Sequence, residues 1–215
     1  MGQKINPKVL RLGPVYNWSS LWYEDKKYKE TLLEDYKIRK ALMEKLKNAG
    51  ISEIDIERSI NSLKITAYVS KPGMVIGRGG TGLDELKAYL QKEFLRKVSG
   101  KQQFKLDIRV EPIKNPNLDA YLVAKNISEQ LIRRLPAKRI MASTVEKVMG
   151  SGAKGVRIVL SGRIGGAEIG RREKIQVGTV PLSTIRETIR YASHPALTKK
   201  GYIGVKVWIN REEEE

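Results

Sequence analysis

A short glycine-rich segment, residues 77–80, constrains the fold of this chain more than any other feature. A brief apolar run at residues 74–76 precedes it, and apolar residues at helical spacing follow it. Thr81 and Asp84 have the spacing of a capping box, in which two side chains satisfy free backbone amides at a helix start. The segment therefore predicts a tight glycine turn that leads directly into a capped amphipathic helix.

The glycine turn has the pattern Gly-x-x-Gly and consists of Gly77, Arg78, Gly79 and Gly80. Since no Cβ stands at either end, the backbone can approach the phosphates of a single nucleic-acid strand closely. The following helix points free amides and the positive end of its dipole at the same place, and Arg78 adds a cation. Val75 and Ile76 would form an apolar floor for unstacked bases. We therefore interpret the loop as an element that binds single-stranded RNA or DNA.

An alternative interpretation of the same glycines is a dinucleotide site. Gly77, Gly79 and Gly82 also spell G-x-G-x-x-G, the fingerprint of nucleotide-binding oxidoreductases. That fingerprint requires a full strand before the first glycine, whereas Pro72 leaves only a short apolar run. It also requires an acid about 20 residues further on, and Glu111 lies beyond that distance. The oxidoreductase is the weaker alternative.

Hydrophobic patterning divides the chain into two α+β halves. The first half is expected to begin with a helix over about residues 28–48, with Leu32, Tyr36, Leu42, Leu46 and Ala49 near one face. Two alternating strands, over residues 54–60 and 63–69, follow it. After them come the helix behind the glycine turn, whose apolar stripe ends at Phe94, and an alternating strand that closes near Val110. Pro112 and the pair Asn115-Pro116 mark the boundary between the halves. The predicted organisation is a basic arm at residues 1–20, a first domain at 21–111, a second domain at 112–210 and an acidic tail at 211–215.

The second half is predicted to contain two helices, a mostly antiparallel sheet and one short helix. The expected segments are helices over residues 118–135 and 136–149, a hairpin within 155–178, a short helix over 181–191 and a strand over 203–209. The hairpin turn would contain a second Gly-x-x-Gly, Gly162 to Gly165, which no helical pattern follows. His194 is expected in a loop, and Trp18 and Trp22 are expected to pack as anchors of the arm.

Charge is the strongest signal in the composition. The chain holds 41 Lys and Arg against 24 Asp and Glu, a formal net charge of +17, which a polyanion would neutralise. The absence of cysteine excludes disulfides and thiolate chemistry, and a single histidine excludes most metal and acid–base sites. No apolar run has the length of a membrane span, and the start lacks a signal peptide. These features favour a soluble, intracellular nucleic-acid-binding protein.

Several long blocks of the sequence are specific enough to indicate a family. In chain order they include MGQKINPKVLRLG, KPGMVIGRGG, GAKGVRIVLSGRIGGAEIGRRE, VPLSTIRETIRYA and GYIGVKVWI. Together they resemble the family of small-subunit ribosomal protein number three, bacterial type, from Met1 through Asn210. The resemblance implies a type II KH domain followed by a C-terminal α+β domain. It also implies a place in the head of the small subunit, bound to small-subunit rRNA and neighbouring head proteins, at the pore where mRNA enters.

The resemblance assigns roles to particular residues. The glycine turn becomes the KH loop, although the family usually has two basic residues between the glycines and this chain has Arg78 and Gly79. Lys138 and Arg139 match the basic helix face at the mRNA entry, and Ala142 stands at its third basic position. We therefore expect mRNA contact and leave a contribution to unwinding open. The candidate rRNA contacts are Lys4, Lys8, Arg11, Lys154, Arg157, Arg163, Arg171 and Arg172.

The expected function is that of a structural, ribosome-bound RNA-binding protein of the cytoplasm. The alternative within the same fold is a free-standing KH protein that regulates RNA. No residue pattern supports catalysis, so no enzyme activity, cofactor or metal is expected. Membrane association and homo-oligomer formation are not expected either.

Overall fold

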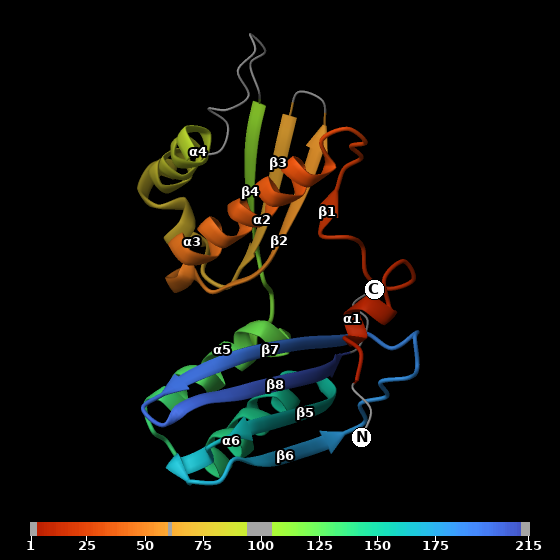
Figure 1. The fold of residues 1–215 in the computed structure, drawn as a ribbon, viewed down its shortest axis with the longest axis vertical. Helices are drawn as coiled ribbons and strands as arrows, with labels where there is room; N and C mark the ends of the chain where they lie inside the picture. Colours follow the sequence, from red (N-terminus) through yellow and green to blue (C-terminus); the bar gives the residue numbers. More distant parts are fainter. Residues whose placement is uncertain (1–3, 60–61, 94–104, 212–215) are drawn as a thin grey trace. The chain divides into compact units, whose positions relative to one another are not determined.

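The computed structural model describes residues 4–59, 62–93 and 105–211 (Figure 1). The chain divides into two compact units, one of Trp18–Lys114 and the other of Met1–Asn17 with Asn115–Glu215. We refer to them as the central unit and the C-terminal unit. The first residues of the chain thus belong to the C-terminal unit, whereas the sequence suggested a separate arm over residues 1–20.

In the described residues, the central unit has a four-stranded sheet and the α-helices α2, α3 and α4 (Figure 1). In chain order its elements are β1 (Ser20–Leu21), α2 (Tyr28–Lys45), β2 (Ile51–Ser59), β3 (Ser62–Val69), α3 (Pro72–Ile76), α4 (Thr81–Glu93) and β4 (Lys105–Pro112). The strand order is β1-β2-β3-β4, with β2 and β3 antiparallel and β3 and β4 parallel. The order α2-β2-β3-α3-α4-β4 is that of the type II KH domain implied by the resemblance.

The core of the central unit follows the predicted alternation in the strands. Ile56 pairs with Ile65, which pairs with Ile108, and all three side chains are buried. Leu86 and Leu90 of α4 pack into the same cluster, as the helical spacing after the glycine turn predicted. Phe94, the last residue expected in that stripe, lies outside the described residues.

Helix α2 buries only the C-terminal part of the predicted face, where Leu42 is 2% exposed. Leu32 and Tyr36 were expected inside and are largely exposed, whereas Asp35 is 2% exposed. The Asp35 carboxylate is satisfied because Trp22 Nε1 donates to Oδ2 at 2.8 Å and Arg58 Nε donates to Oδ1 at 2.7 Å. A buried charge of this kind is tolerated when it is paired and hydrogen-bonded, and hydropathy alone cannot reveal it.

The two tryptophans near the start of the central unit differ in their surroundings. Trp22 is partly buried, donates to Asp35 and contacts Tyr28 in a tilted arrangement with ring centroids 5.3 Å apart. Trp18 is 64% exposed, so the prediction that it packs as an anchor is wrong.

The C-terminal unit is a sheet with two helices on one face (Figure 1). Its elements are α1 (Pro7–Leu10), α5 (Ala120–Ile132), α6 (Ala137–Gly150), β5 (Ala153–Gly162), β6 (Arg171–Gly178), β7 (Ile189–Thr198) and β8 (Gly201–Arg211). The strand order is β6-β5-β8-β7, and every neighbouring pair is antiparallel. The α+β class predicted for this half is confirmed.

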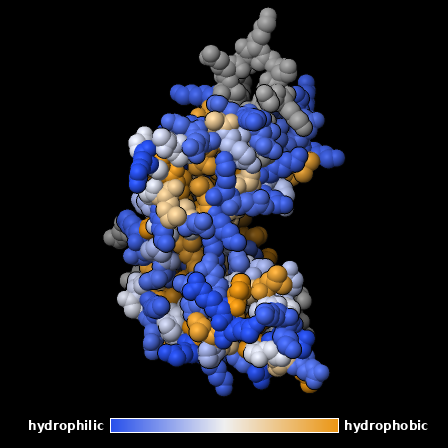
Figure 2. All heavy atoms as spheres, turned by 90° about the vertical axis from the view of Figure 1, so that its left-hand side faces the viewer, coloured by the Kyte–Doolittle hydropathy of each residue, from blue (hydrophilic) through white to orange (hydrophobic). Residues whose placement is uncertain are grey.

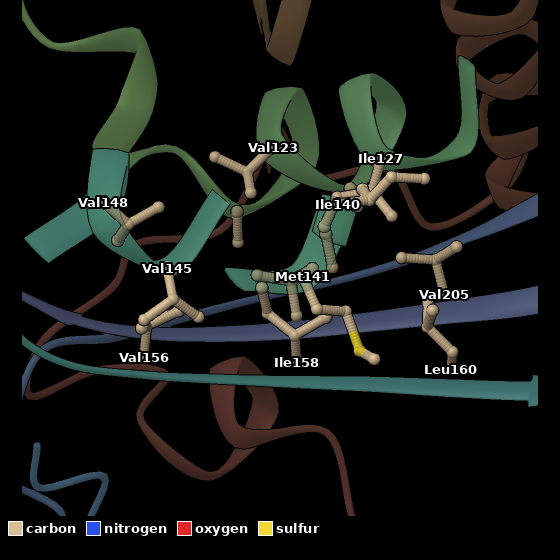
Figure 3. Packing of buried hydrophobic residues seen from close by; sticks show 14 of the residues in the cluster. Val123, Ile127, Ile140, Met141, Val145, Val148, Val156, Ile158, Leu160 and Val205 are labelled. Carbon is tan, nitrogen blue, oxygen red and sulfur yellow. The ribbon is translucent and has the colours of Figure 1, made fainter. Parts of the chain in front are cut away.

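Alternation within the strands decides which face of this sheet the helices cover. Val156, Ile158 and Leu160 of β5 point to α5 and α6, and so does Val205 of β8 (Figure 3). The helices contribute Val123 and Ile127 from α5 and Ile140, Met141, Val145 and Val148 from α6. Since side chains alternate along a strand, Arg157 and Val159 lie on the opposite face, away from α5 and α6.

The short helix expected over residues 181–191 is absent from the described structure, and strand β7 begins at Ile189 instead. Ile189–Thr198 pairs along the free edge of β8, so it satisfies backbone groups that would otherwise remain unpaired. His194 consequently lies within a strand and not in a loop. Its neighbour Pro195 fits there because β7 is an edge strand.

The second Gly-x-x-Gly of the sequence joins two antiparallel neighbours, β5 and β6. A short 3₁₀ turn, Ile164–Gly166, follows Gly162, and Gly165 has a φ of 67°. The interpretation of this segment as a hairpin turn, and not as a second loop of the KH type, is confirmed.

Candidate nucleic-acid interface

The glycine loop of the central unit lies between α3 and α4. Gly77, Gly79 and Gly80 have φ values of 71°, 65° and 87°, a region that residues with a Cβ adopt only rarely. A Cβ on Gly77 would also lie 3.0 Å from the Gly82 nitrogen. The sharp reversal between the two helices therefore depends on glycine at these positions.

Gly82 is a residue whose role the sequence did not reveal. It belongs to the first turn of α4, and a Cβ there would lie 2.4 Å from the Val75 carbonyl oxygen. Such a distance is below any real contact, so glycine is what lets α4 approach the backbone of α3. The match of Gly82 to a dinucleotide fingerprint thus reflects helix packing.

The start of α4 differs in detail from a capping box. Thr81 has helical angles, φ −55° and ψ −36°, and is the first residue of the helix. Its hydroxyl donates to the Arg78 carbonyl oxygen at 3.0 Å. The predicted helix start is correct, but Thr81 ties the helix back to the glycine loop and does not accept from an amide as an N-cap.

The loop presents one cation beside an apolar surface. Arg78 is exposed, and the neighbouring Met74 and Ile76 are 59% and 38% exposed. Val75, which was expected in an apolar floor for bases, is 2% exposed and packs in the core. The surface available to a base at this loop is therefore formed by Met74 and Ile76.

The face of the C-terminal sheet opposite α5 and α6 is strongly basic. Strand register places Arg157 of β5, Arg172 and Lys174 of β6, and Lys206 of β8 on this face. Arg157 also lies over the Trp208 ring, 5.1 Å from its centroid. We call Lys4, Arg157, Arg172, Lys174 and Lys206 the basic sheet face.

Lys4 is included because its ammonium interacts electrostatically with the cations of this face. The neighbouring Arg157 guanidinium lowers the pKa of the Lys4 ammonium below its usual value, with smaller effects from desolvation and from Lys174 and Arg172. Like charges crowd here without an acid among them, which favours an anionic partner.

Arg11 does not lie on the protein surface, which corrects its prediction as an rRNA contact. Its side chain is fully buried in the C-terminal unit, at 0% exposure. The guanidinium donates to five backbone carbonyl oxygens, those of Pro7 at 3.1 Å, Pro181 at 3.1 Å, Leu182 at 3.2 Å, Thr184 at 2.7 Å and Glu187 at 2.7 Å. Arg11 therefore ties the start of the chain to the irregular segment before β7.

The remaining arm and strand candidates stand apart from one another. Lys8 is partly buried, with its ammonium 5.9 Å from the centre of the Tyr16 ring. Lys154 is exposed near the start of β5, at the opposite end of that strand from Arg163.

The helix face predicted for the mRNA entry is exposed. Lys138 and Arg139 lie in the first turn of α6, while Ile140 and Met141 point into the core. Ala142, one turn further on, is also exposed. The position at which the resemblance implies a third basic residue is therefore also exposed to solvent.

Three of the predicted residues come together at one end of the C-terminal unit. Lys138, Arg163 and Arg171 line a pocket of about 560 Å³ with three cations that the sequence did not single out, Arg134, Lys199 and Lys200. The pocket lies between three connections, α5 to α6, β5 to β6 and β7 to β8. Only the folded chain brings these connections together, so spacing along the sequence gave no indication of the site.

Two further findings concern metal binding and membrane-spanning helices. Across residues 4–59, 62–93 and 105–211, no group of three or more His, Cys, Asp or Glu is arranged to hold a metal ion. None of the helices in the same part of the chain is long and apolar enough to cross a membrane.

Comparison with protein families matches both units. A family model described as KH domain matches residues 37–118, and one described as ribosomal protein S3, C-terminal domain, matches residues 127–209. The fold and these matches define a two-domain ribosomal protein with an N-terminal KH domain. Its class is that of RNA-binding components of the small subunit.

Full-length relatives give the same result. The chain is 47% identical over 213 residues to a protein of Lactobacillus acidophilus, which covers 99% of this chain and 92% of the relative. It is 45% identical to a relative from Desulfitobacterium hafniense, with coverage of 99% and 94%. Both relatives are named small ribosomal subunit protein uS3. The chain therefore belongs to the uS3 family, whose members are structural components and not enzymes.

Proposed function

We propose that this chain is bound in the head of the small ribosomal subunit, where it holds rRNA and contributes to the mRNA entry pore. The observation that carries the proposal is the basic sheet face. Strand register gathers cations from β5, β6 and β8 on one surface, and Lys4 adds a fourth segment. Phosphate neutralisation with release of counterions is the binding mechanism that such a surface favours.

The proposal extends to neighbouring head proteins. Ile169, Leu197 and Tyr202 of the C-terminal unit are more than half exposed. Apolar side chains left on the surface of a strongly charged unit are suited to contacts with other proteins. A ribosome-bound state would cover both the basic and the apolar surfaces.

The KH loop adds a site for an unpaired RNA strand. Its backbone is open to phosphates at Gly79 and Gly80, where a Cβ would meet nothing within 4 Å. Arg78 supplies one charge, and Met74 and Ile76 offer apolar surface for bases. The loop thus combines a backbone that phosphates can approach closely with apolar surface for bases. It carries one cation where the resemblance implies two.

Changing Arg78 and Gly79 together to Asp is expected to weaken single-stranded RNA binding at least tenfold. The change replaces a cation by two carboxylates where phosphates would approach. A modest loss of stability is expected because Gly79 has a positive φ, although both positions are exposed and Asp tolerates positive φ better than most residues. Fluorescence anisotropy with a short unpaired RNA measures the effect.

A charge-matched control is Gln91→Asp with Lys92→Asp at the far end of α4, where both residues are exposed. This pair changes the net charge by the same amount away from the loop. Equal losses for the two pairs would mean that overall charge, and not the KH loop, determines the binding.

Lys138 and Arg139 are proposed to touch mRNA at the entry pore. Their double alanine variant is expected to reduce mRNA crosslinking to this chain severalfold, because α6 presents both side chains to solvent. Site-specific crosslinking from mRNA in assembled ribosomes is the measurement. Lys147→Ala, exposed at the other end of α6, serves as the control. Crosslinks unchanged by the double variant would make the pair a solvated helix face.

A further inference from the structure

Helix α5 ends with a residue that is unusual for its position. Among the described residues, Arg134 is the only one other than glycine with a positive φ, at 62°. The Arg134 amide donates to the Leu131 carbonyl oxygen at 3.0 Å, and the Leu135 amide donates to that of Gln130 at 3.3 Å, as in a Schellman motif. Glycine is the usual residue at this point of the motif, because a Cβ strains the left-handed conformation. Arginine here costs stability, and strain of this kind is concentrated at binding sites.

Arg134 lines the pocket at the end of the C-terminal unit. The pocket volume of about 560 Å³ lies within the range usual for small ligands. This end of the unit, where β5 and β7 finish in Figure 1, faces the viewer in Figure 2. Hydrophilic side chains surround a few hydrophobic ones in that part of the surface. The strained arginine therefore belongs to a site with room for a ligand.

The charge of the lining calls for an anion with several phosphates. Six cations line the pocket against one acid, Glu173, whose Oε1 lies 3.5 Å from Arg171 Nε. Six positive charges and one negative charge leave an excess of five. A single phosphate group carries about two negative charges at most, so one phosphate does not neutralise the lining. Successive phosphates along a nucleic-acid strand would do so.

The turn between β5 and β6 repeats the backbone conformation of the KH loop at this pocket. Gly165 has φ 67° and ψ 12°, and Gly79 of the KH loop has φ 65° and ψ 16°. The next residue is in each case a glycine with positive φ, 82° at Gly166 and 87° at Gly80. A Cβ on Gly165 would meet nothing within 4 Å, as on Gly79. Although it is a hairpin turn that no helix follows, it offers a phosphate the same open backbone.

Helix α6 supplies the helix start that this turn lacks. The residue before α6 is Pro136, which makes no side-chain cap, and no acid stands in the first turn. Pro136 and Ala137 both line the pocket. The free amides and the positive dipole end of a 14-residue helix therefore open into it. At the KH loop, α4 begins directly after the glycines and has the same role.

Apolar surface lies beside these groups. Leu135 is 49% exposed and lines the pocket together with Pro136. An unstacked base can rest on such a surface, and every base has a flat face that suits it. We therefore expect little preference among the bases.

We propose that this pocket is a second site for an unpaired RNA strand, with phosphates at the Gly165–Gly166 turn and at the start of α6, and with Arg134 held in its strained conformation to meet them. Lys199 and Lys200, exposed between β7 and β8, contribute further cations from the pocket lining. The inference rests on the proposed RNA-binding function and adds to it a site outside the KH domain.

The first test is binding of the pentanucleotide UUUUU to the full chain carrying Arg78→Asp and Gly79→Asp, in which the KH loop no longer contributes. Fluorescence anisotropy is expected to show binding that persists in this background, with AAAAA bound within about threefold of UUUUU. Uridine triphosphate has a similar charge without a strand and is expected to bind about tenfold more weakly or less. Absence of pentanucleotide binding would overturn the proposal, and so would equal binding of the triphosphate.

Arg134→Gly in the same background separates binding from stability. The variant is expected to weaken UUUUU about fivefold, through loss of a phosphate contact, and to raise the melting temperature because glycine relieves the positive φ. Arg134→Lys keeps both the charge and the strain, so it should retain most of the binding without a gain in melting temperature. Unchanged binding by Arg134→Gly would overturn the role of Arg134.

Arg133→Gly is the matched control. Arg133 is exposed beside Arg134 but has a φ of −72° and does not line the pocket. Its loss changes the charge equally, yet it should leave UUUUU binding unchanged and lower the melting temperature, since glycine gains nothing at a negative φ. An equal loss of binding in the two glycine variants would overturn the location.

A second pair of variants tests the opposite side of the pocket. Lys199→Ala with Lys200→Ala should weaken UUUUU about fivefold or more, whereas Lys29→Ala with Lys37→Ala, exposed on α2, makes the same charge change elsewhere. Equal losses for the two pairs would overturn the location. The Arg134→Gly chain should still sediment with the small subunit, because the basic sheet face is unaltered. Failure of this inference therefore differs from failure of the proposed function.

Discussion

Replacement of Arg11 by Met is expected to destabilise the C-terminal unit by about 3 kcal/mol or more, because buried carbonyl oxygens lose a charged donor. The Arg11 guanidinium donates to five carbonyl oxygens, four of them in residues 181–187. Met keeps the length of the aliphatic stem, so the loss comes from the hydrogen bonds. Hydrogen–deuterium exchange of peptides covering residues 180–198 measures the effect directly, and these peptides should exchange faster by about two orders of magnitude.

Arg172→Met is the matched control, since Arg172 is an exposed arginine on β6 of the same unit. Its exchange rates are expected to equal those of the unaltered chain. If Arg11→Met left the exchange of residues 180–198 unchanged, the segment before β7 would be held by its strand pairing and not by Arg11.

Changing Lys4, Arg172 and Lys174 together to Ala is expected to weaken rRNA binding about 100-fold at 0.1 M salt, with the slope of log affinity against log salt reduced by about 2. Each lost phosphate contact removes about 0.7 from that slope on single strands, and three are removed. All three side chains are exposed on the basic sheet face, so stability should be unaffected. Filter binding to small-subunit rRNA over a range of salt concentrations gives both quantities.

Lys29, Lys37 and Lys40 changed together to Ala provide a control of equal charge, because all three are exposed on α2. Their loss should leave the slope nearly unchanged. If the slope falls equally for both triple variants, rRNA affinity depends on the net charge of the chain and not on the basic sheet face.

Local patterns predicted most of the elements correctly. Alternation in β2, β3 and β4, and helical spacing in α4, α5 and α6, arise from burial of one face and are visible within a short window of sequence. Strand β7 was missed because it owes its conformation to pairing with β8 rather than to a pattern of its own. The segment Ile189–Thr198 has His194 and Pro195 in its middle, and no pattern in it predicts a strand.

Charge in the sequence did not distinguish structural cations from exposed ones. Lys4 and Arg11 lie in the same basic stretch, yet Lys4 is exposed and Arg11 is completely buried. Four of the five carbonyl oxygens that hold Arg11 are 170 to 176 residues away along the chain, for example at a separation of 173 for Thr184. The same holds for the pocket, where Lys138, Arg163 and Lys200 meet only through the fold.

The glycine loop shows the opposite case, in which the sequence revealed the site but not its details. Gly77 and Gly80 were identified from their spacing, and both have the positive φ that a glycine turn requires. The burial of Val75, the exposure of Met74 and the need for Gly82 depend on how α3 and α4 pack, which spacing cannot show.

Sedimentation of the tagged full-length chain from cell lysate through a sucrose gradient tests the central claim most directly. If the chain is a structural rRNA-binding component, it should migrate with the small subunit at moderate salt and remain there after a high-salt wash. Protein that stays at the top of the gradient, with no peak at the small subunit, would contradict the proposed ribosomal role and favour a free-standing KH protein that regulates RNA.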